Sequence, residues 1–264
     1  MCIRDSPRAG LVKRAAWLRA HREPERSVLV DAGDILDVNP DDLLARGILE
    51  SYADLGYDAV AVGDQEFANG IARLLEYREG SPLLSNNLAL CPDESRCVFF
   101  SVHPLLVSRS GVRVGVFALI DPEVFALYPG ELTSALKISA PADLAPVILE
   151  ELREEGAELT ILLYHGPYER ARELALQLRG LDLLVLGHEQ RLIDAEAAGD
   201  TTIVSPGAEG NRLGILTVSL DARGRRRVDN RFELFRWETS PDDPAVRRRI
   251  VEYREAMRGR VIER

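Results

Sequence analysis

Four side chains that can bind a metal ion each follow a short apolar stretch of the sequence. They are Asp34, Asp64, His165 and His188. Carboxylate oxygens and imidazole nitrogens are the ligands that divalent cations from Mg²⁺ to Zn²⁺ use in proteins. A lone aspartate in such a place is more often a turn or cap residue, whereas four metal-binding groups at matching positions indicate a site. The sequence therefore predicts a metal centre wherever the fold brings these four residues together.

The apolar stretches before these residues are typical of buried strands in a parallel sheet. Such strands read as short, continuous apolar runs rich in β-branched residues, and ligands bind at their carboxyl ends. The four runs cover residues 28–30, 59–62, 159–164 and 183–186. We therefore expect four strands to deliver the four side chains to one edge of a sheet.

Length and composition set broad limits on the fold and on the partners. With 264 residues, of which 46% are hydrophobic and 29% charged, the chain can form one large α/β domain or two small ones. The net charge of −10 argues against a nucleic-acid polymer as partner. A small phosphate ester remains compatible with an acidic protein, because a bound cation reverses the local sign of charge.

No targeting or membrane segment is visible in the sequence. No apolar run approaches the ~20 residues of a membrane-spanning helix, and no signal peptide precedes the first predicted element. Residues 1–9 fit no element of the predicted fold, and we interpret them as a leader or an artefact foreign to it.

Periodicity and turn signals predict the remaining elements. Predicted helices cover residues 10–21, 39–56, 69–77, 142–155, 168–178 and 245–258. Further predicted strands cover residues 82–87, 98–106, 111–120, 201–205, 213–220 and 225–235. A turn is predicted at 222–224. The first helix is expected to bury Leu11, Ala15 and Leu18 and to keep Lys13 and Arg14 on its other sides.

Two cysteines bracket a polar loop. Cys91 and Cys97 flank residues 92–96, and either a free thiol pair or a disulfide in an exported protein fits this spacing. A zinc site would require further ligands close by, and the neighbouring sequence offers none. The pair therefore leaves the redox environment of the chain open.

The strand-end motifs, taken in order, resemble a known family. They read VDAGD (30–34), LGYDAVAVGDQEF (55–67), LLSNNL (83–88), GVRVGVFAL (111–119), LLYHG (162–166), LDLLVLGHEQ (181–190) and TIVSPGAEGNRLG (202–214). Over roughly residues 10–235 the chain resembles the metallophosphoesterase domain of the 5′-nucleotidase type, in the calcineurin-like superfamily. This resemblance implies a four-layer α/β/β/α sandwich with its first strand missing. It assigns residues 10–238 to that domain and 239–264 to a charged C-terminal helix, which could tether a downstream domain or partner.

The resemblance also implies a two-metal site that hydrolyses a phosphate ester. By position, Asp34 would bridge two cations, and Asp64 stands where the family usually has Asn. The other implied ligands are His165, His188 and Gln190, and the implied cation is one of Zn²⁺, Mn²⁺, Fe²⁺, Ca²⁺ or Mg²⁺. Asn86 and Asn87 match a segment that lies near the phosphate in the family.

Several departures from the family pattern bear on activity. The family opens with a strand carrying Asp-x-His, and no such strand precedes the first predicted helix. Gln65 replaces a histidine that helps to stabilise the transition state, Ala68 replaces the aspartate that orients it, and Gln190 replaces a histidine ligand. Since an amide cannot carry a proton charge, we interpret Gln65 as a neutral donor to a phosphoryl oxygen in the catalytic position.

Two hypotheses follow from the sequence. The first is a divergent metal-dependent phosphoesterase that acts on a small-molecule phosphate ester such as a nucleotide. The second is a non-catalytic binding or scaffold domain that retains the fold. By the same resemblance, a periplasmic or other extracytoplasmic location is expected.

Overall fold

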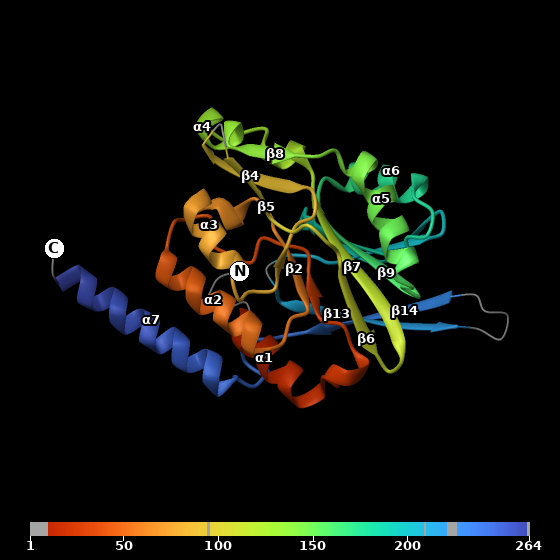
Figure 1. Ribbon diagram of the computed structural model, residues 1–264. Helices are drawn as coiled ribbons and strands as arrows, with labels where there is room; N and C mark the ends of the chain where they lie inside the picture. The colour runs from red at the N-terminus through yellow and green to blue at the C-terminus, as the bar shows by residue number, and fades with distance from the viewer. Residues whose placement is uncertain (1–9, 94–95, 209, 221–225, 263–264) are drawn as a thin grey trace.

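Two β-sheets lie face to face between two layers of helices in the computed structural model (Figure 1). The structure describes residues 10–93, 96–208, 210–220 and 226–262. The predicted α/β/β/α sandwich is confirmed. The predicted leader at 1–9 and the predicted turn at 222–224 lie outside the described residues.

The smaller sheet carries the first two predicted ligands. Its order is β1-β2-β3 and its strands run parallel; they are β1 (Val30–Asp31), β2 (Ala59–Ala61) and β3 (Leu83–Leu84). Its outer face packs against helices α1 (Gly10–His21), α2 (Asp42–Asp54), α3 (Ile71–Arg78) and α7 (Pro244–Ile262). The buried side chains of Ile48, Tyr52 and Leu74 belong to this core. Because β2 lies in the middle of the sheet, all three of its residues are buried.

The larger sheet carries the two histidines. Its order is β11-β12-β10-β9-β7-β6, with strands β6 (Leu105–Arg109), β7 (Val112–Ile120), β9 (Leu159–Gly166), β10 (Leu183–His188), β11 (Leu192–Ala198) and β12 (Thr201–Pro206). The four central strands are parallel, and the two edge strands are antiparallel to their neighbours. Helices α5 (Pro141–Glu154) and α6 (Tyr168–Gln177) cover the outer face.

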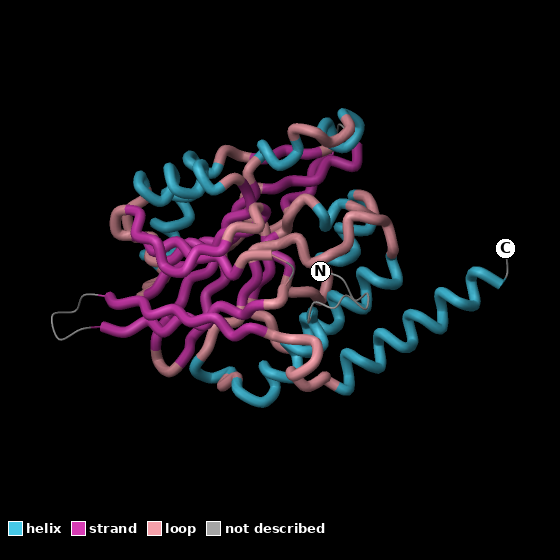
Figure 2. Tube along the Cα trace, turned by 180° about the vertical axis from the view of Figure 1, so that it is seen from behind, coloured by secondary structure: helices cyan, strands magenta, loops and turns pink. Residues whose placement is uncertain are grey.

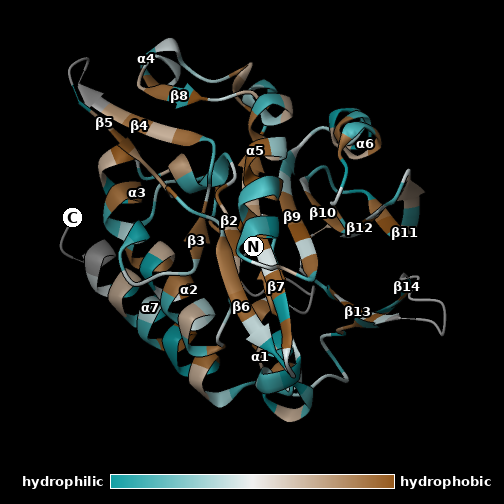
Figure 3. Cartoon of the chain, turned by 45° about the vertical axis from the view of Figure 1, so that its right-hand side comes forward, coloured by the Kyte–Doolittle hydropathy of each residue, from teal (hydrophilic) through white to brown (hydrophobic). Residues whose placement is uncertain are grey.

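Apolar side chains fill the space between the two sheets. Ala59 and Ala61 of β2 face Val116 and Ala118 of β7 and Leu163 of β9 in one buried cluster. Small side chains at these positions let the sheets approach closely. Figure 3 shows β2 and β9 in mainly hydrophobic colours, whereas α5 and α6 show hydrophobic and hydrophilic residues side by side. The alternation on the helices is the amphipathic pattern that a covering layer requires.

Smaller elements complete the chain. A three-stranded antiparallel sheet and a hairpin are formed by β4 (Leu88–Asp93), β5 (Arg96–Phe99), β8 (Leu136–Ile138), β13 (Arg212–Leu220) and β14 (Arg226–Leu234). The hairpin strands project from the body (Figure 2). Short helices are η1 (Pro24–Arg26), η2 (Gln65–Phe67), η3 (Pro122–Phe125) and α4 (Gly130–Ser134). No helix among the described residues is long and apolar enough to span a membrane.

Two predictions about the middle of the chain are settled by the structure. The strand predicted over 98–106 is wrong, because β5 and β6 belong to different sheets and residues 100–104 turn between them. Cys91 of β4 and Cys97 of β5 form a disulfide. Of the two interpretations of this pair, the disulfide is the one that the structure bears out.

The charged face predicted for α1 is buried instead. Lys13 is 7% exposed and Arg14 is 5% exposed. Lys13 forms an ion pair with Asp242 at 2.6 Å, and Arg14 lies 3.6 Å from Asp31. The prediction was wrong because other elements cover these sides of α1: Lys13 pairs with the segment before α7, and Arg14 lies against Asp31 of β1 and the Tyr52 hydroxyl of α2.

The C-terminal helix is only partly an appendage. Val246 and Ile250 of α7 are buried in the same core as α1 and α2, and Asp243, 1% exposed, caps the helix through the backbone N–H of Val246. Beyond this half, α7 extends away from the body (Figures 1 and 2). The predicted domain boundary at residue 239 stays a prediction. The tethering role stays a prediction.

Candidate metal centre

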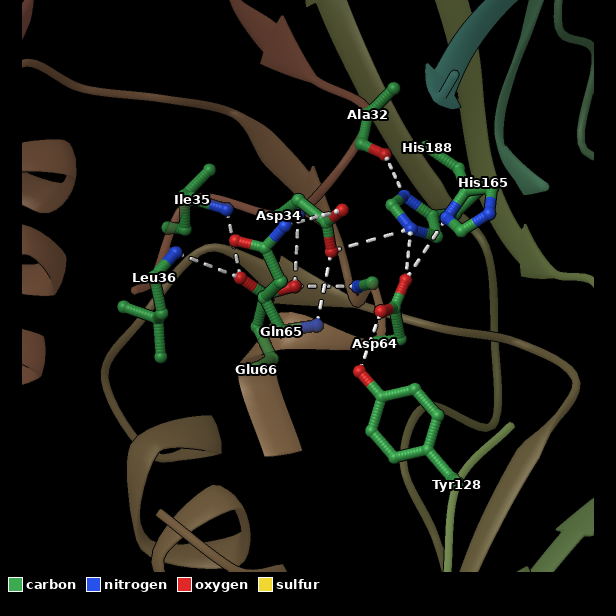
Figure 4. Close-up of polar contacts among 11 residues, drawn as sticks. Ala32, Asp34, Ile35, Leu36, Asp64, Gln65, Glu66, Tyr128, His165 and His188 are labelled. Carbon is green, nitrogen blue, oxygen red and sulfur yellow. Dashed lines mark hydrogen bonds and ion pairs between the residues drawn. The ribbon is translucent and has the colours of Figure 1, made fainter. Parts of the chain in front are cut away.

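The four predicted metal-binding residues come together where the carboxyl ends of the two sheets meet (Figure 4). Asp34 and Asp64 follow β1 and β2, while His165 and His188 lie at the ends of β9 and β10. One ligand atom from each residue lies within 4.8 Å of all the others. The expected single sheet edge is therefore a junction of two edges, and the convergence of the four residues is confirmed.

Left-handed backbone conformations at two separate strand ends aim Asp34 and His188 into the junction. Asp34 and His188 have φ angles of 60° and 72°, and Gly33 has a φ of 97°. For residues other than glycine, this left-handed region costs about 1–3 kcal/mol each and persists only where the surroundings enforce it. Gly63 is required for a different reason, since an added Cβ would lie 2.4 Å from Asp34 Oδ1. The local backbone is thus shaped around the Asp34 carboxylate.

His165 is held in the orientation that a metal ligand needs. The ring is fully buried, and its Nδ1 lies 2.7 Å from the backbone oxygen of Ala32. Because a carbonyl oxygen can only accept, Nδ1 carries the hydrogen, which leaves Nε2 for a cation. Nε2 points toward Asp34 Oδ1 at 3.3 Å and Asp64 Oδ1 at 3.1 Å.

Those carboxylates hold a proton on His165 in the metal-free protein. Burial alone would lower the pKa of His165, but the hydrogen bond with Asp64 and the charge of Asp34 outweigh it and raise the pKa to about 9. A cation that binds at Nε2 has to displace this proton.

The two carboxylates have opposite electrostatic character. Burial raises the pKa of Asp34. Burial also acts to raise the pKa of Asp64, but hydrogen bonds from His165, His188 and Tyr128 outweigh burial and hold that pKa well below its usual range. Asp64 Oδ1 lies 3.1 Å from a nitrogen of each histidine, and its Oδ2 accepts from the Tyr128 hydroxyl at 2.6 Å.

Glu66 organises the site although the sequence did not single it out. Its fully buried carboxylate accepts backbone N–H groups from Gly63, Asp34, Ile35 and Leu36 at 2.6, 3.0, 2.8 and 3.1 Å. Burial and the charge of Asp34 raise the pKa of Glu66 to about 7. It therefore ties the loop after β1 to the loop after β2. The available signal was an acid two positions after a predicted ligand.

The two glutamines of the predicted site lie in different surroundings. Gln65 contacts Asp34 twice, through its backbone N–H at 3.0 Å and its Nε2 at 3.1 Å. Gln190 is exposed and lines the groove beside His188. The catalytic role of Gln65 and the metal-ligand role of Gln190 stay predictions.

Asn86 and Asn87 have a structural role that the sequence did not reveal. Asn86 Oδ1 accepts the backbone N–H of Ala118 at 2.9 Å. Asn87 bonds both backbone groups of Ile120, accepting at 2.9 Å and donating at 2.8 Å. Both amides thus fasten the segment after β3 to β7, and both are buried. Their predicted contact with substrate stays a prediction.

A groove of about 680 Å³ leads to the cluster. Asp34, His188 and Gln190 line one part of it, Arg14 lines another, and side chains of β13 and β14 contribute to the wall. This volume lies within the range of about 300–1,000 Å³ typical of small-molecule sites. The groove therefore has room for a small ligand beside the four residues.

The donor set fits a divalent cation. Two ligands on opposite sides of an ion, each about 2.0–2.3 Å from it, lie about 4–4.6 Å apart. The 4.8 Å limit of this cluster is close to that spacing even without an ion in place. Two carboxylates and two imidazoles suit Zn²⁺, Fe²⁺ or Mn²⁺, and six-coordinate Fe²⁺ or Mn²⁺ would keep positions for water or substrate.

Sequence comparison relates the chain to nucleotide phosphoesterases. No protein-family model matches it. It is 24% identical over 257 residues to the trifunctional nucleotide phosphoesterase YfkN of Bacillus subtilis (strain 168), covering 80% of this chain and 18% of that protein. It is 29% identical over 246 residues to the probable 5′-nucleotidase of Treponema pallidum (strain Nichols), covering 82% of this chain and 40% of that protein. The chain thus spans less than half the length of either relative.

Solved structures share the fold. The sulfate thiohydrolase SoxB of Thermus thermophilus in complex with glycerol gives a TM-score of 0.79 at 22% identity, over 94% of this chain and 47% of that one. The 5′-nucleotidase precursor from the same species gives a TM-score of 0.77 at 22% identity. The match covers 95% of this chain and 53% of that one. The calcineurin-like phosphoesterase YfkN from Bacillus subtilis gives a TM-score of 0.76 at 20% identity. The match covers 96% of this chain and 90% of that one.

The chain therefore has the fold of the calcineurin-like phosphoesterases. By sequence it is similar, at 24–29% identity, to proteins named as nucleotide phosphoesterase and probable 5′-nucleotidase.

Proposed function

We propose that this protein is a divergent metal-dependent phosphoesterase that hydrolyses a small-molecule phosphate ester such as a nucleotide. The observation that carries the proposal is the convergence of two carboxylates and two imidazoles at the strand ends of a phosphoesterase fold. The groove beside this cluster provides space for the ester.

The residues of this chain divide the work between binding and positioning. When bound, a divalent cation supplies Lewis-acid stabilisation of the phosphoryl oxygens and lowers the pKa of a water molecule. Asp34, Asp64, His165 and His188 are the residues that would hold it. An amide has two N–H donors, so Gln65 can hold Asp34 with one and donate to a phosphoryl oxygen with the other.

The charge of the site makes metal dependence a necessary part of the proposal. Asp34, Asp64 and Glu66 lie together in a protein with a net charge of −10. Without a cation these carboxylates repel a phosphate group. Because the donor set mixes imidazole and carboxylate, we propose Zn²⁺, Fe²⁺ or Mn²⁺ ahead of Ca²⁺ and Mg²⁺.

The proposal is tested by metal binding and phosphate release measured on the same samples. Protein stripped with a chelator is reloaded with Mn²⁺ or Zn²⁺ and assayed on a panel of nucleotides and a chromogenic phosphate ester. The double variant Asp34→Ala/His188→Ala should lose both bound metal and hydrolysis. His103→Ala is the matched control, since His103 is an exposed histidine that pairs with Glu151 instead. Metal binding without hydrolysis of any ester would reject the proposed phosphoesterase activity.

That last outcome would favour the second candidate, a binding domain that retains the fold. One observation supports it. Gln65 cannot carry a proton charge, and its backbone and side-chain N–H groups both donate to Asp34. In this case nucleotides would bind to the metal-loaded protein, as seen by calorimetry, and would remain intact after prolonged incubation.

We also propose that the protein functions outside the cytoplasm, in an oxidising compartment such as the periplasm. The Cys91–Cys97 disulfide supports this location, because glutathione and thioredoxin keep cytoplasmic thiols reduced. Thiol labelling of denatured protein isolated from its native source tests it. Full labelling of both cysteines without prior reduction would contradict the proposed location.

A further inference from the structure

Tyr128 reaches the metal centre from an element that contributes none of the four ligands. It lies between η3 and α4, and its hydroxyl donates to Asp64 Oδ2 at 2.6 Å (Figure 4). The half-buried ring is fixed by an edge contact with Phe125 at 5.3 Å, and Phe125 in turn contacts Phe67 of η2 at 5.2 Å. A chain of aromatic contacts therefore holds the hydroxyl beside the segment that carries Asp64.

The hydrogen bonds divide the two oxygens of Asp64 between different partners. Oδ1 faces both histidines, on the side where a cation would bind. Oδ2 faces Tyr128. A carboxylate can bind a cation through one oxygen or through both, and it can rotate between these modes unless a second partner fixes it.

We propose that Tyr128 is a positioning residue that fixes Asp64 as a one-oxygen ligand, with Oδ1 directed to the cation. This inference rests on the proposed metal-dependent function and adds a residue that the strand-end motifs do not contain. Tyrosine suits the role because its hydroxyl is a neutral hydrogen-bond donor on a rigid ring. It can orient the Asp64 carboxylate without placing a second positive charge beside the bound cation. Removal of the hydroxyl leaves Asp64 free to rotate or to pair more closely with the histidines.

The test is metal binding by the variant Tyr128→Phe. Mn²⁺ and Co²⁺ are titrated into chelator-stripped protein by calorimetry, and the visible spectrum of the Co²⁺ complex reports its coordination. We expect affinity to fall by roughly tenfold, within the range known for residues that orient metal ligands, together with a changed Co²⁺ spectrum. The matched control is Tyr77→Phe, which removes an equivalent 2.6 Å bond from a tyrosine to Asp42 outside the site and should leave metal affinity unchanged.

A double-mutant cycle shows whether Tyr128 acts through the carboxylate. In the background Asp64→Asn, the ligand has only one acceptor oxygen, so Tyr128→Phe should change affinity by less than about threefold. Equal metal affinity and an unchanged Co²⁺ spectrum for Tyr128→Phe would overturn the positioning role while leaving the proposed function intact. Absence of metal binding by the unsubstituted protein would reject both.

Discussion

Two clusters of buried charge in this molecule differ in how their charges are balanced. Beneath α1, Arg14 lies against the Asp31 carboxylate, the Tyr52 hydroxyl and the rings of Tyr52 and Tyr57. At the metal centre, the half-buried Asp34 and the fully buried Glu66 both have raised pKa values, and the nearest cation is a protonated His165. In the first cluster the buried cation faces a carboxylate and a hydroxyl of the protein itself, whereas the second gains from a bound cation.

The backbone shows the same contrast. Arg14 and Tyr52 project from regular helices, α1 and α2. Asp34 and His188 occupy left-handed backbone conformations at strand ends. Strain and unbalanced charge at one place are features of functional sites, while relaxed backbone and paired charge are features of structural networks. This difference predicts that substitutions in the two clusters will have opposite consequences for metal binding and for stability.

The largest effect is expected from removing two ligands. Asp34→Ala/His188→Ala should weaken Mn²⁺ or Zn²⁺ binding by more than about 1,000-fold, which corresponds to about 4 kcal/mol. In the presence of chelator, the same variant should be no less stable than the unsubstituted protein. The reason is that it removes Asp34, a carboxylate that lies close to the carboxylates of Asp64 and Glu66. Calorimetry measures the first quantity and urea unfolding the second. A variant that loses stability but retains metal would place this cluster among the structural networks.

The reverse result is expected at the other cluster. Arg14→Met should lower the free energy of unfolding by about 3–4 kcal/mol, because Asp31 and two tyrosines lose the cation that they surround. Metal affinity should not change, and urea unfolding beside a metal titration measures both. Lys13→Met is the control for loss of a buried cation on the same helix. If Arg14→Met also abolished metal binding, the two clusters would form one network.

The contrast also marks what the sequence could predict. Asp34, Asp64, His165 and His188 were predictable because each lies at or shortly after the carboxyl end of its own strand, and parallel strands share the direction in which their ends point. Burial of Lys13 and Arg14 was not predictable, since helical periodicity shows which residues share a face but not whether another element covers it. For Lys13 that cover comes from residues more than 220 positions further along the chain, and for Arg14 it comes from β1 and α2.

The same limit explains which site residues the sequence missed. Glu66 acts through backbone N–H groups of a separate loop, and backbone contacts leave no side-chain pattern to find. Tyr128 meets Asp64 only because the segment between η3 and α4 reaches the segment after β2, an arrangement that no local motif encodes. The chain over 98–106 is continuously strand-like, yet it divides between two sheets because the tertiary fold overrides local propensity.

The next largest effect is expected in the pH dependence of stability, which the metal centre should dominate. In the metal-free protein, the folded-state pKa values of Glu66 and His165 are about 7 and about 9, above their ordinary values. At these two groups the folded state then binds more protons than the unfolded state, so between pH 5 and pH 9 stability is highest at pH 5 and falls as pH rises through these values. We expect a loss on the order of 3 kcal/mol between pH 5 and pH 9 in chelator.

Urea unfolding at pH 5, 7 and 9 measures this loss. Saturating metal should reduce or reverse it, because a cation displaces the proton from His165 and binds more tightly as pH rises. The control is Glu66→Gln, which removes one of the two titrating groups and should flatten the slope between pH 5 and pH 7. A metal-free protein that becomes more stable toward pH 9 would contradict the charge balance inferred for the metal centre.

The smallest effect is expected for the stability of Glu66→Gln itself. One oxygen of Glu66 accepts from Ile35 and Leu36 and the other from Gly63 and Asp34, so an amide nitrogen on either side must face two N–H donors. We expect a loss of about 1–2 kcal/mol at pH 7 and roughly tenfold weaker metal binding, because the Asp34 loop is no longer fixed. Glu158→Gln is the control, since Glu158 accepts an exposed backbone N–H from Arg113 far from the metal centre. If the two variants behaved alike, Glu66 would be a packing residue only, and the Asp34 loop would hold its shape through its own strained backbone.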